Sequence, residues 1–64
     1  MSEFHRKVTA LLRQHLFEKV PGGKGSHEKW RGGQPKVTLT VPKNLKSRHT
    51  ANAILKSAGL KNRF

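Results

Sequence analysis

One histidine of this chain lies in surroundings that suit acid–base chemistry. His27 directly follows a glycine-rich turn at residues 21–25 and begins an alternating segment. Alternation along a strand places His27 on the same face as Lys29 and Arg31, with Trp30 on the opposite face, toward a core. An imidazole can accept a proton, and the positive surface around it can hold a phosphate. His27 is therefore the candidate catalytic residue.

The reaction that best suits one histidine among many cations is the cleavage of RNA. The ribose 2′-hydroxyl is an internal nucleophile that attacks the adjacent phosphate. The protein then needs to supply a base, cations for the developing charge and an acid for the leaving oxygen. DNA lacks this hydroxyl and requires an activated water. The residues alone leave open whether His27 is catalytic or an inert surface histidine.

The sequence offers few ligands for a metal centre. Two-metal nucleases need several convergent carboxylates, whereas this chain has 3 acidic residues, of which Glu3 is placed to begin a helix. His5 and His15 are ten residues apart rather than the four that put two ligands on one helix face. We interpret both as half-buried helix residues. No metal site and no other cofactor are therefore expected.

Composition points to an anionic partner. The chain has 64 residues, 14 lysines and arginines against 3 acidic residues, and a formal charge of +11. This balance is typical of nucleic-acid binders, and a basic domain without a polyanionic target is the alternative. No window approaches the ~18 apolar residues of a membrane span, and residues 1–7 lack the apolar stretch of a signal peptide. We expect a cytoplasmic protein with one domain over residues 1–64, without cysteines to staple it.

The elements that position these residues follow from hydrophobic patterning. Residues 3–16 have the period of an amphipathic helix, with Ser2 as a candidate N-cap. The apolar arc of this helix comprises Phe4, Val8, Leu11, Leu12 and Leu16. Strands are predicted at residues 17–20, 26–31 and 36–41, separated by turns rich in glycine and proline. Because a strand follows it, we interpret the first of these turns as a hairpin turn rather than a phosphate loop.

A second helix is predicted to begin near Arg48, with Ser47 or Thr50 as its N-cap. Gly59 stands where a left-handed residue commonly ends a helix, and Leu60 is the apolar residue that usually follows it.

The predicted order is therefore helix, strand, strand, strand, helix, an α+β fold. Strands joined by short turns form a three-stranded antiparallel sheet with one solvated face, and both helices cover the other face. Residues 61–64 are expected to form a frayed tail, although Phe64 could fold back onto the core.

Three motifs are combined along this chain. They are Gly25-Ser26-His27 followed by Trp30, the segment from Val37 to Pro42, and the helix ending Ile54-Leu55-x-x-Ala58-Gly59-Leu60. Together they resemble the HicA family, small bacterial and archaeal toxins of type II toxin–antitoxin systems. The resemblance extends from the first helix to Leu60.

The resemblance implies a fold like that of a double-stranded-RNA-binding domain, in agreement with the patterning. It also implies an mRNA interferase, an endoribonuclease that cleaves mRNA and arrests growth. The family's catalytic histidine is that of the Gly-Ser-His motif, which is His27 here. A HicB antitoxin is expected to cover the active face. The chain departs from the family at His49, where many relatives have glycine, and at Lys43-Asn44, where relatives often carry a histidine.

Further site residues are expected from their positions. Those expected to bind RNA phosphates are Lys24, Lys29 and Arg31 near His27, and Lys46 and Arg48 at the start of the second helix. A helix N-terminus itself favours phosphate. The general acid stays open among His49, a lysine and water. The alternative function is a non-catalytic RNA-binding module of the same fold.

Overall fold

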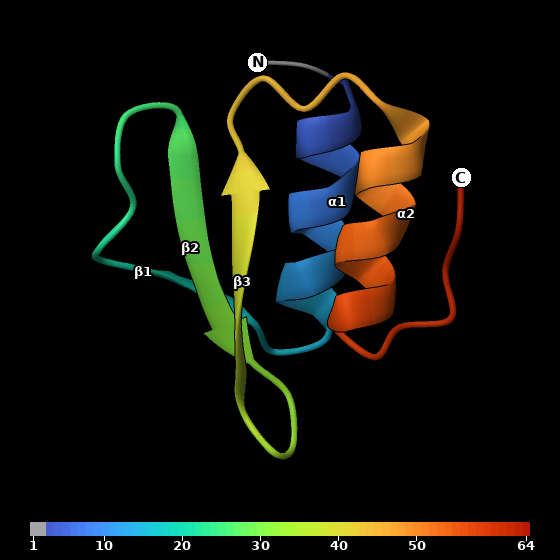
Figure 1. Ribbon diagram of the computed structural model, residues 1–64. Coiled ribbons are helices and arrows are strands. Elements are labelled where there is room, and N and C mark those ends of the chain that lie inside the picture. The colour runs from blue at the N-terminus through green and yellow to red at the C-terminus, as the bar shows by residue number, and fades with distance from the viewer. Residues whose placement is uncertain (1–2) are drawn as a thin grey trace.

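Two helices and three strands follow one another in the predicted order. The computed structural model describes residues 3–64, so the expected N-cap, Ser2, lies outside the described residues. The elements are α1 (Glu3–Gln14), β1 (Glu18–Val20), β2 (His27–Gly32), β3 (Val37–Pro42) and α2 (Arg48–Ser57) (Figure 1). The predicted α+β fold is thereby confirmed. Neither described helix is long and apolar enough to cross a membrane.

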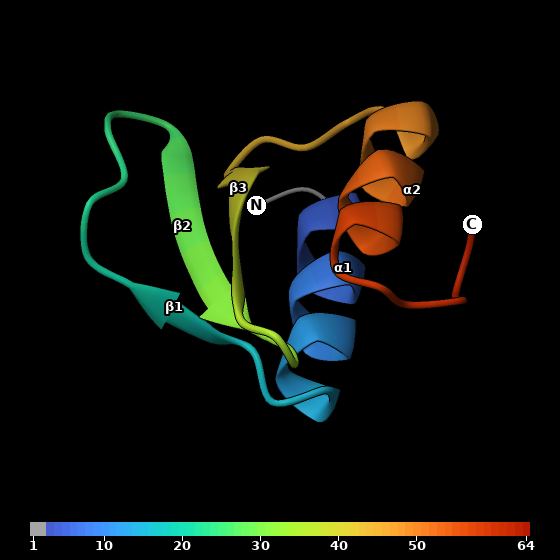
Figure 2. The ribbon, with the colours of Figure 1, turned by 60° about the horizontal axis from the view of Figure 1, so that its bottom comes forward.

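The three strands form one antiparallel sheet in the order β1-β2-β3. Both helices lie on the same side of this sheet (Figures 1 and 2). Burial alternates along β2, where Glu28, Trp30 and Gly32 are buried and the residues between them are exposed. The predicted alternation is confirmed, so one face of β2 belongs to the core and the other to solvent.

The core fills the space between the sheet and the helices. Trp30 of β2 is 1% exposed and is the largest fully buried side chain. The guanidinium of Arg13 lies over its ring, 5.0 Å from the centroid. The other buried apolar residues are Val8, Leu12, Phe17, Leu39, Val41, Leu45, Ala51, Ile54, Leu55 and Leu60. They come from both helices, from β3 and from the connecting segments, so the sheet and the helices share one core.

The first helix is shorter than its apolar period predicts. It ends at Gln14, and Leu16 adopts a left-handed conformation with φ 66°. This reversal brings Phe17 into the core, with its N–H donating to the Leu12 carbonyl at 2.9 Å. Leu16 is 86% exposed, so its expected place in the apolar arc is wrong. His15 is also exposed and lies beyond the helix, contrary to its interpretation as a half-buried helix residue.

The second helix begins and ends as predicted. The Ser47 hydroxyl accepts a hydrogen bond from the Thr50 N–H and caps the helix. At the other end Gly59 has φ 78°, and the Leu60 N–H donates to the Leu55 carbonyl at 3.0 Å. This is the bond of a Schellman ending, and Leu60 is buried as that motif requires.

The C-terminal residues are held in place rather than frayed. The Phe64 N–H donates to Asn52 Oδ1 at 2.8 Å. The ring of Phe64 meets that of Phe4 edge to face, with centroids 5.4 Å apart. The expectation of a frayed tail is therefore wrong, and the alternative, in which Phe64 folds back onto the core, is confirmed.

Candidate active site

His27 lies at the end of the molecule where β2 begins, β3 ends and both helices start (Figure 1). Its backbone N–H donates to the Lys24 carbonyl at 3.0 Å, which closes the turn before the strand. Its side chain is exposed on the sheet face away from the helices, as predicted. The strand therefore fixes the backbone of His27 and leaves the imidazole accessible.

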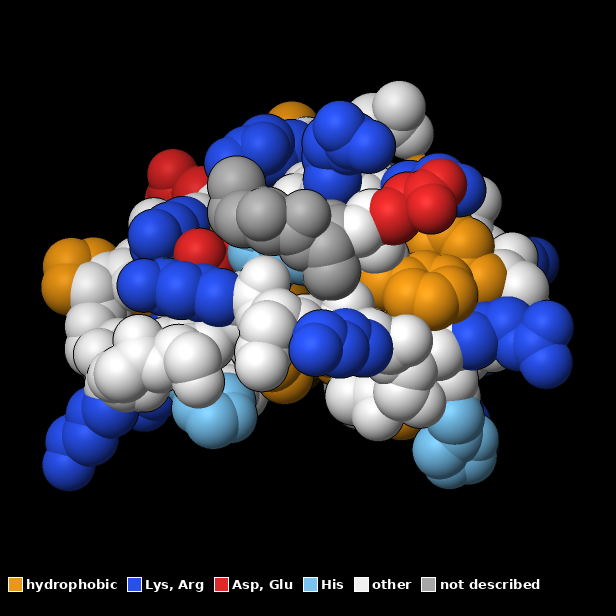
Figure 3. Space-filling view, turned by 90° about the horizontal axis from the view of Figure 1, so that it is seen from above, with side chains coloured by type: hydrophobic (Ala, Val, Ile, Leu, Met, Phe, Trp, Pro, Cys, Tyr) orange, Lys and Arg blue, Asp and Glu red, His pale blue; other side chains and the backbone are white. Residues whose placement is uncertain are grey.

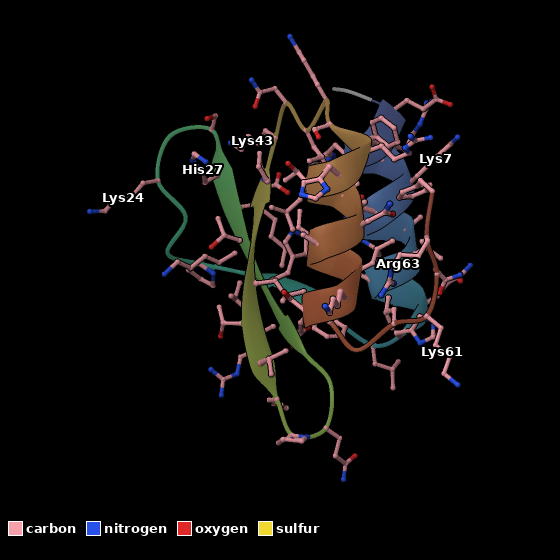
Figure 4. All side chains as sticks on the ribbon, turned by 45° about the vertical axis from the view of Figure 1, so that its right-hand side comes forward. Lys7, Lys24, His27, Lys43, Lys61 and Arg63 are labelled. Carbon is pink, nitrogen blue, oxygen red and sulfur yellow. The ribbon has the colours of Figure 1, made fainter. Side chains whose placement is uncertain are left out.

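The end of β3 brings a lysine next to His27. Pro42 is the register partner of His27 and has no N–H to donate. The next residue, Lys43, donates its N–H to the Ser26 carbonyl at 2.6 Å and so extends the pairing beyond His27. The side chains of His27 and Lys43 lie at the same end of the sheet and line one hollow (Figure 4).

The glycine-rich loop forms the other wall of this hollow. A Cβ at Gly23 would lie 2.3 Å from the His27 carbonyl oxygen and 3.2 Å from Glu28 Cα. The loop backbone therefore passes directly against the start of β2, and only glycine allows this approach. The turn that sequence patterning predicted as a hairpin connection thus also shapes the surroundings of His27.

The resulting hollow is small, open and basic. Its volume is about 220 Å³, below the ~300–1,000 Å³ typical of pockets for whole small molecules. Its charged or titratable side chains are Lys19, His27, Glu28, Lys29 and Lys43. Lys29 and Lys43 supply positive charge beside the histidine. Glu28 turns its carboxylate into the core, and Lys19, the register partner of Trp30, directs its ammonium to that carboxylate. Such an arrangement suits one phosphate group of a longer polymer.

The structure separates the predicted RNA-binding residues into two groups. Lys29 lines the hollow with His27. Lys24 extends from the loop away from the hollow (Figure 4), and Arg31 lies further along the open sheet face, opposite Thr38. The remaining two residues are outside the hollow, at the end of the molecule where α2 begins. Lys46 precedes the helix and Arg48 is its first residue. Figure 3 shows lysine and arginine side chains spread around this whole end.

Glu28 links the end of β2 that carries His27 to helix α1. Glu28 is 6% exposed, and its Oε1 accepts from Trp30 Nε1 at 3.2 Å and lies 2.9 Å from His5 Nε2. Lys19 Nζ approaches the other oxygen at 3.5 Å. His5 is buried rather than half-buried, since it belongs to this cluster. Glu28, the residue that follows His27, is thus held by contacts from both α1 and β1.

Opposing effects determine the protonation of Glu28. Burial raises the pKa of its carboxyl. The hydrogen bonds from His5 and Trp30 and the nearby positive charge together lower this pKa by more than burial raises it. The net pKa of Glu28 is below its ordinary value, which favours the ionised form.

Three residues around His27 escaped the sequence-based prediction. Glu28 could have been found, because the alternation that buries Trp30 also buries Glu28, and a charged residue in a core register needs partners. Lys43 could have been found from hairpin pairing, since the end of one strand meets the start of its partner. Lys19 gave no such signal, because its position depends on how β1 pairs at the sheet edge.

Within residues 3–64, no group of three or more histidine, aspartate or glutamate side chains is arranged to hold a metal ion. The closest association of such groups is the pair of His5 and Glu28. That pair is buried in the core and is separated from solvent.

The fold and the site define a small basic α+β domain that presents one histidine among cations. The sequence model of the HicA toxin family of bacterial toxin–antitoxin systems matches residues 5–60. The chain therefore belongs to the HicA family and is a toxin of a toxin–antitoxin system, in which an antitoxin is its partner. No curated protein and no solved structure matches the chain.

Proposed function

We propose that this toxin is an endoribonuclease of the mRNA interferase type, with His27 as its catalytic residue. The observation that carries the proposal is the exposed imidazole of His27 in a hollow that Lys29 and Lys43 also line. Membership of the HicA family supports the same chemistry. The cations hold a phosphate next to a group that can move a proton, and RNA supplies its own nucleophile.

In the proposed reaction His27 accepts the proton of a ribose 2′-hydroxyl. The 2′-oxygen forms a bond to the adjacent phosphorus while the bond from phosphorus to the 5′-oxygen of the next nucleotide breaks. The products are a 2′,3′-cyclic phosphate and a 5′-hydroxyl, whose proton comes from a lysine, from His49 or from water. The ammonium groups stabilise the negative charge that develops on the phosphorane oxygens.

The remaining cations are proposed to bind the RNA on either side of the scissile bond. Lys24 and Arg31 flank the hollow on the loop and on the open sheet face. Lys46 and Arg48 lie near the N-terminus of α2, where the unpaired N–H groups also favour phosphate. The scissile phosphate is thus assigned to the hollow and the flanking phosphates to its rim.

The partner antitoxin is proposed to be of the HicB type and to shield His27. The toxin carries a charge of +11, so an antitoxin surface rich in carboxylates complements it and competes with RNA for the same cations.

The test is cleavage of end-labelled RNA in excess EDTA by the wild type, His27→Ala and His15→Ala. His15 is an exposed histidine at the opposite end of α1, so it is a matched control. We expect His27→Ala to lose about 10²- to 10⁴-fold in rate, the usual contribution of a general base. His15→Ala should cleave like the wild type, and the products should carry 2′,3′-cyclic phosphates.

Two results would contradict the proposal. Equal cleavage by wild type and His27→Ala would remove His27 from the reaction. Salt-sensitive RNA binding by all three proteins without any cleavage would favour a non-catalytic RNA-binding module.

A further inference from the structure

The two edges of the sheet differ in how they are protected. β1 has only three residues, of which Glu18 and Lys19 are charged, and Pro21 follows it. Short length, charge and proline are the usual means by which proteins prevent unwanted pairing at a sheet edge. β3 has six residues, Val37–Pro42, and none of them is charged. Its proline, Pro42, is the last residue of the strand, so Val37 to Val41 lack the protection that short length and charge give to β1.

The backbone along β3 is available for pairing on its outer side. β3 is the last strand of the sheet and pairs only with β2 among the described strands. Outside helices and strand pairs, none of the backbone hydrogen bonds of the described residues involves Val37 to Val41. Donors and acceptors on that side are thus free to bind an added strand.

A groove runs beside this edge, between β3 and α2. Its volume is about 240 Å³ and all of its lining residues are uncharged. They are Thr38, Leu39 and Thr40 of β3 and Thr50, Ala53, Ile54 and Ser57 of α2. Figures 1 and 4 both show β3 standing between β2 and the helices. Small side chains on the helix leave room for a further backbone, and Leu39 and Ile54 form a buried apolar floor.

We propose that this groove receives an extended segment of the antitoxin, which pairs with β3 as a fourth strand. The inference rests on the toxin–antitoxin assignment but not on ribonuclease activity. Strand addition supplies affinity through main-chain hydrogen bonds, and the pockets beside the edge select alternate side chains. The segment therefore has small or β-branched residues where it faces Ala53 and Ser57.

Charge around the groove distinguishes this occupant from a second copy of the chain. Lys36 and Lys43 frame β3, and Arg48 and Lys56 stand near the two ends of α2. A segment with carboxylates at both ends complements these cations. Two copies pairing antiparallel through β3 would place Lys36 of one molecule near Lys43 of the other, between molecules that each carry +11. Such a homodimer is opposed by like-charge repulsion.

An added strand would lie within reach of the catalytic surface. Neighbouring strands are ~4.8 Å apart, so a fourth strand lies about 10 Å from β2. The antitoxin can therefore hold the toxin at the β3 edge and extend across the open sheet face to His27. Anchoring and shielding are then performed by different parts of the antitoxin.

The experiment compares Ala53→Arg with Ala10→Arg in binding to the purified antitoxin. Both alanines are exposed helix residues, and both variants gain the same side chain and charge. Only Ala53 lies in the groove. We expect Ala53→Arg to weaken antitoxin binding at least tenfold by calorimetry and Ala10→Arg to change it less than twofold. In the wild-type complex, amide hydrogen exchange of Val37 to Val41 should slow at alternate residues.

Each contrary outcome overturns the inference. Equal affinity of the two variants, or unchanged exchange along β3 in the complex, would rule out strand addition. A wild-type homodimer in sedimentation that Ala53→Arg dissociates would assign the groove to a second copy. Failure of the wild type to cleave RNA would reject the ribonuclease proposal alone, since the antitoxin measurements do not depend on cleavage.

Discussion

Glu28 connects the core of this toxin to its candidate catalytic residue. It follows His27 directly and is held by His5 from α1 and by Trp30 from its own strand. We propose that Glu28 acts on the reaction through the backbone of His27, as a positioning residue. Its buried carboxylate also makes the folded state sensitive to acid.

We predict that the free energy of unfolding decreases when the pH is lowered past about 4.3, the ordinary pKa of glutamate. The pKa of Glu28 is lowered in the folded state, because its hydrogen bonds and nearby positive charge outweigh the effect of burial. The unfolded chain therefore takes up a proton first as the pH falls. The stabilisation is fully present above the ordinary pKa and is lost as the pH decreases through the folded-state pKa.

Urea denaturation of the wild type and Glu28→Gln between pH 7 and pH 3 tests this prediction. The variant should be less stable at pH 7 by about 1–3 kcal/mol, because it loses a charge-assisted buried hydrogen bond. Its stability should also depend less on pH. Glu3, whose pKa is lowered by its hydrogen bond with Lys7, is present in both proteins and cancels in the comparison. Parallel pH profiles would contradict the role of Glu28.

Leu16 is strained and exposed, so its replacement should stabilise the fold. Its φ of 66° is unfavourable for a residue with a side chain, and its 86% exposure means that little apolar burial would be lost. We expect Leu16→Gly to gain about 0.5–1 kcal/mol after the entropic cost of glycine. The melting temperature should rise by about 3–6 °C, whereas Ala10→Gly inside α1 should lower it.

At the scale of elements, the loop at residues 21–25 determines the surroundings of His27 as much as β2 does. Gly23 and Gly25 belong to the same loop but have different roles. Gly23 lies against the His27 carbonyl, whereas Gly25 has a positive φ of 58° and open space where a Cβ would stand. Substitution of Gly23 therefore tests the close backbone contact with His27, whereas substitution of Gly25 tests the positive φ of the loop.

We predict that Gly23→Ala lowers the rate of RNA cleavage at least tenfold and that Gly25→Ala changes it little. The alanine Cβ at position 23 would lie 2.3 Å from the His27 carbonyl oxygen and must displace the loop or the start of β2. At position 25 the cost is about 1 kcal/mol of backbone strain without displacement of His27. Cleavage assays with melting curves for each variant measure both effects. Equal loss of cleavage in the two variants would contradict the proposed role of the loop.

Most of the elements could be predicted because their periods are unambiguous. The alternation in β2 and the ending of α2 at Gly59 depend on local geometry that short segments specify. The residue at which α1 ends could not be predicted in this way, because Leu16 continues the apolar period of the helix. The chain changes direction at Leu16 so that Phe17 can enter the core, and this depends on tertiary packing. The place of Phe64 likewise depends on Asn52 and Phe4, which are distant in sequence.

The candidate site was predictable mainly along the strand that carries it. Alternation placed His27 and Lys29 on one face, and both line the hollow. Lys43 follows β3 and could be placed by hairpin pairing, whereas the position of Lys19 depends on the register of β1. The proposed roles of Lys24, Arg31, Lys46 and Arg48 stay predictions, and their distance from the hollow suits contacts with flanking phosphates.

At the scale of the whole molecule, cations surround the end that carries His27 (Figure 3). The excess of 14 basic over 3 acidic residues leaves few internal ion pairs to neutralise them. RNA binding should therefore release counterions in proportion to the number of phosphates contacted. The number of contacted phosphates is smaller if RNA binds only in the hollow than if it also binds the cations around the rim.

We predict that the logarithm of the RNA association constant falls with the logarithm of salt concentration with a slope of about −4. This slope corresponds to about six phosphate contacts on a single strand. The cations are Lys29 and Lys43 in the hollow together with Lys24, Arg31, Lys46 and Arg48. Lys24→Gln should reduce the slope by about 0.7, and Lys61→Gln, on the opposite side of the molecule (Figure 4), should leave it unchanged. A wild-type slope of about −1.4 would restrict binding to the hollow.

The alternation of β2 has a consequence for how such a toxin can diverge. Glu28, Trp30 and Gly32 face the core, whereas His27, Lys29 and Arg31 face solvent. Under the proposed function, substitutions at Lys29 and Arg31 would change how tightly RNA is held without altering the packing that stabilises the domain. Selection for RNA affinity and selection for stability would then act on alternate positions of the same six residues, so a lineage could change one property while it preserves the other.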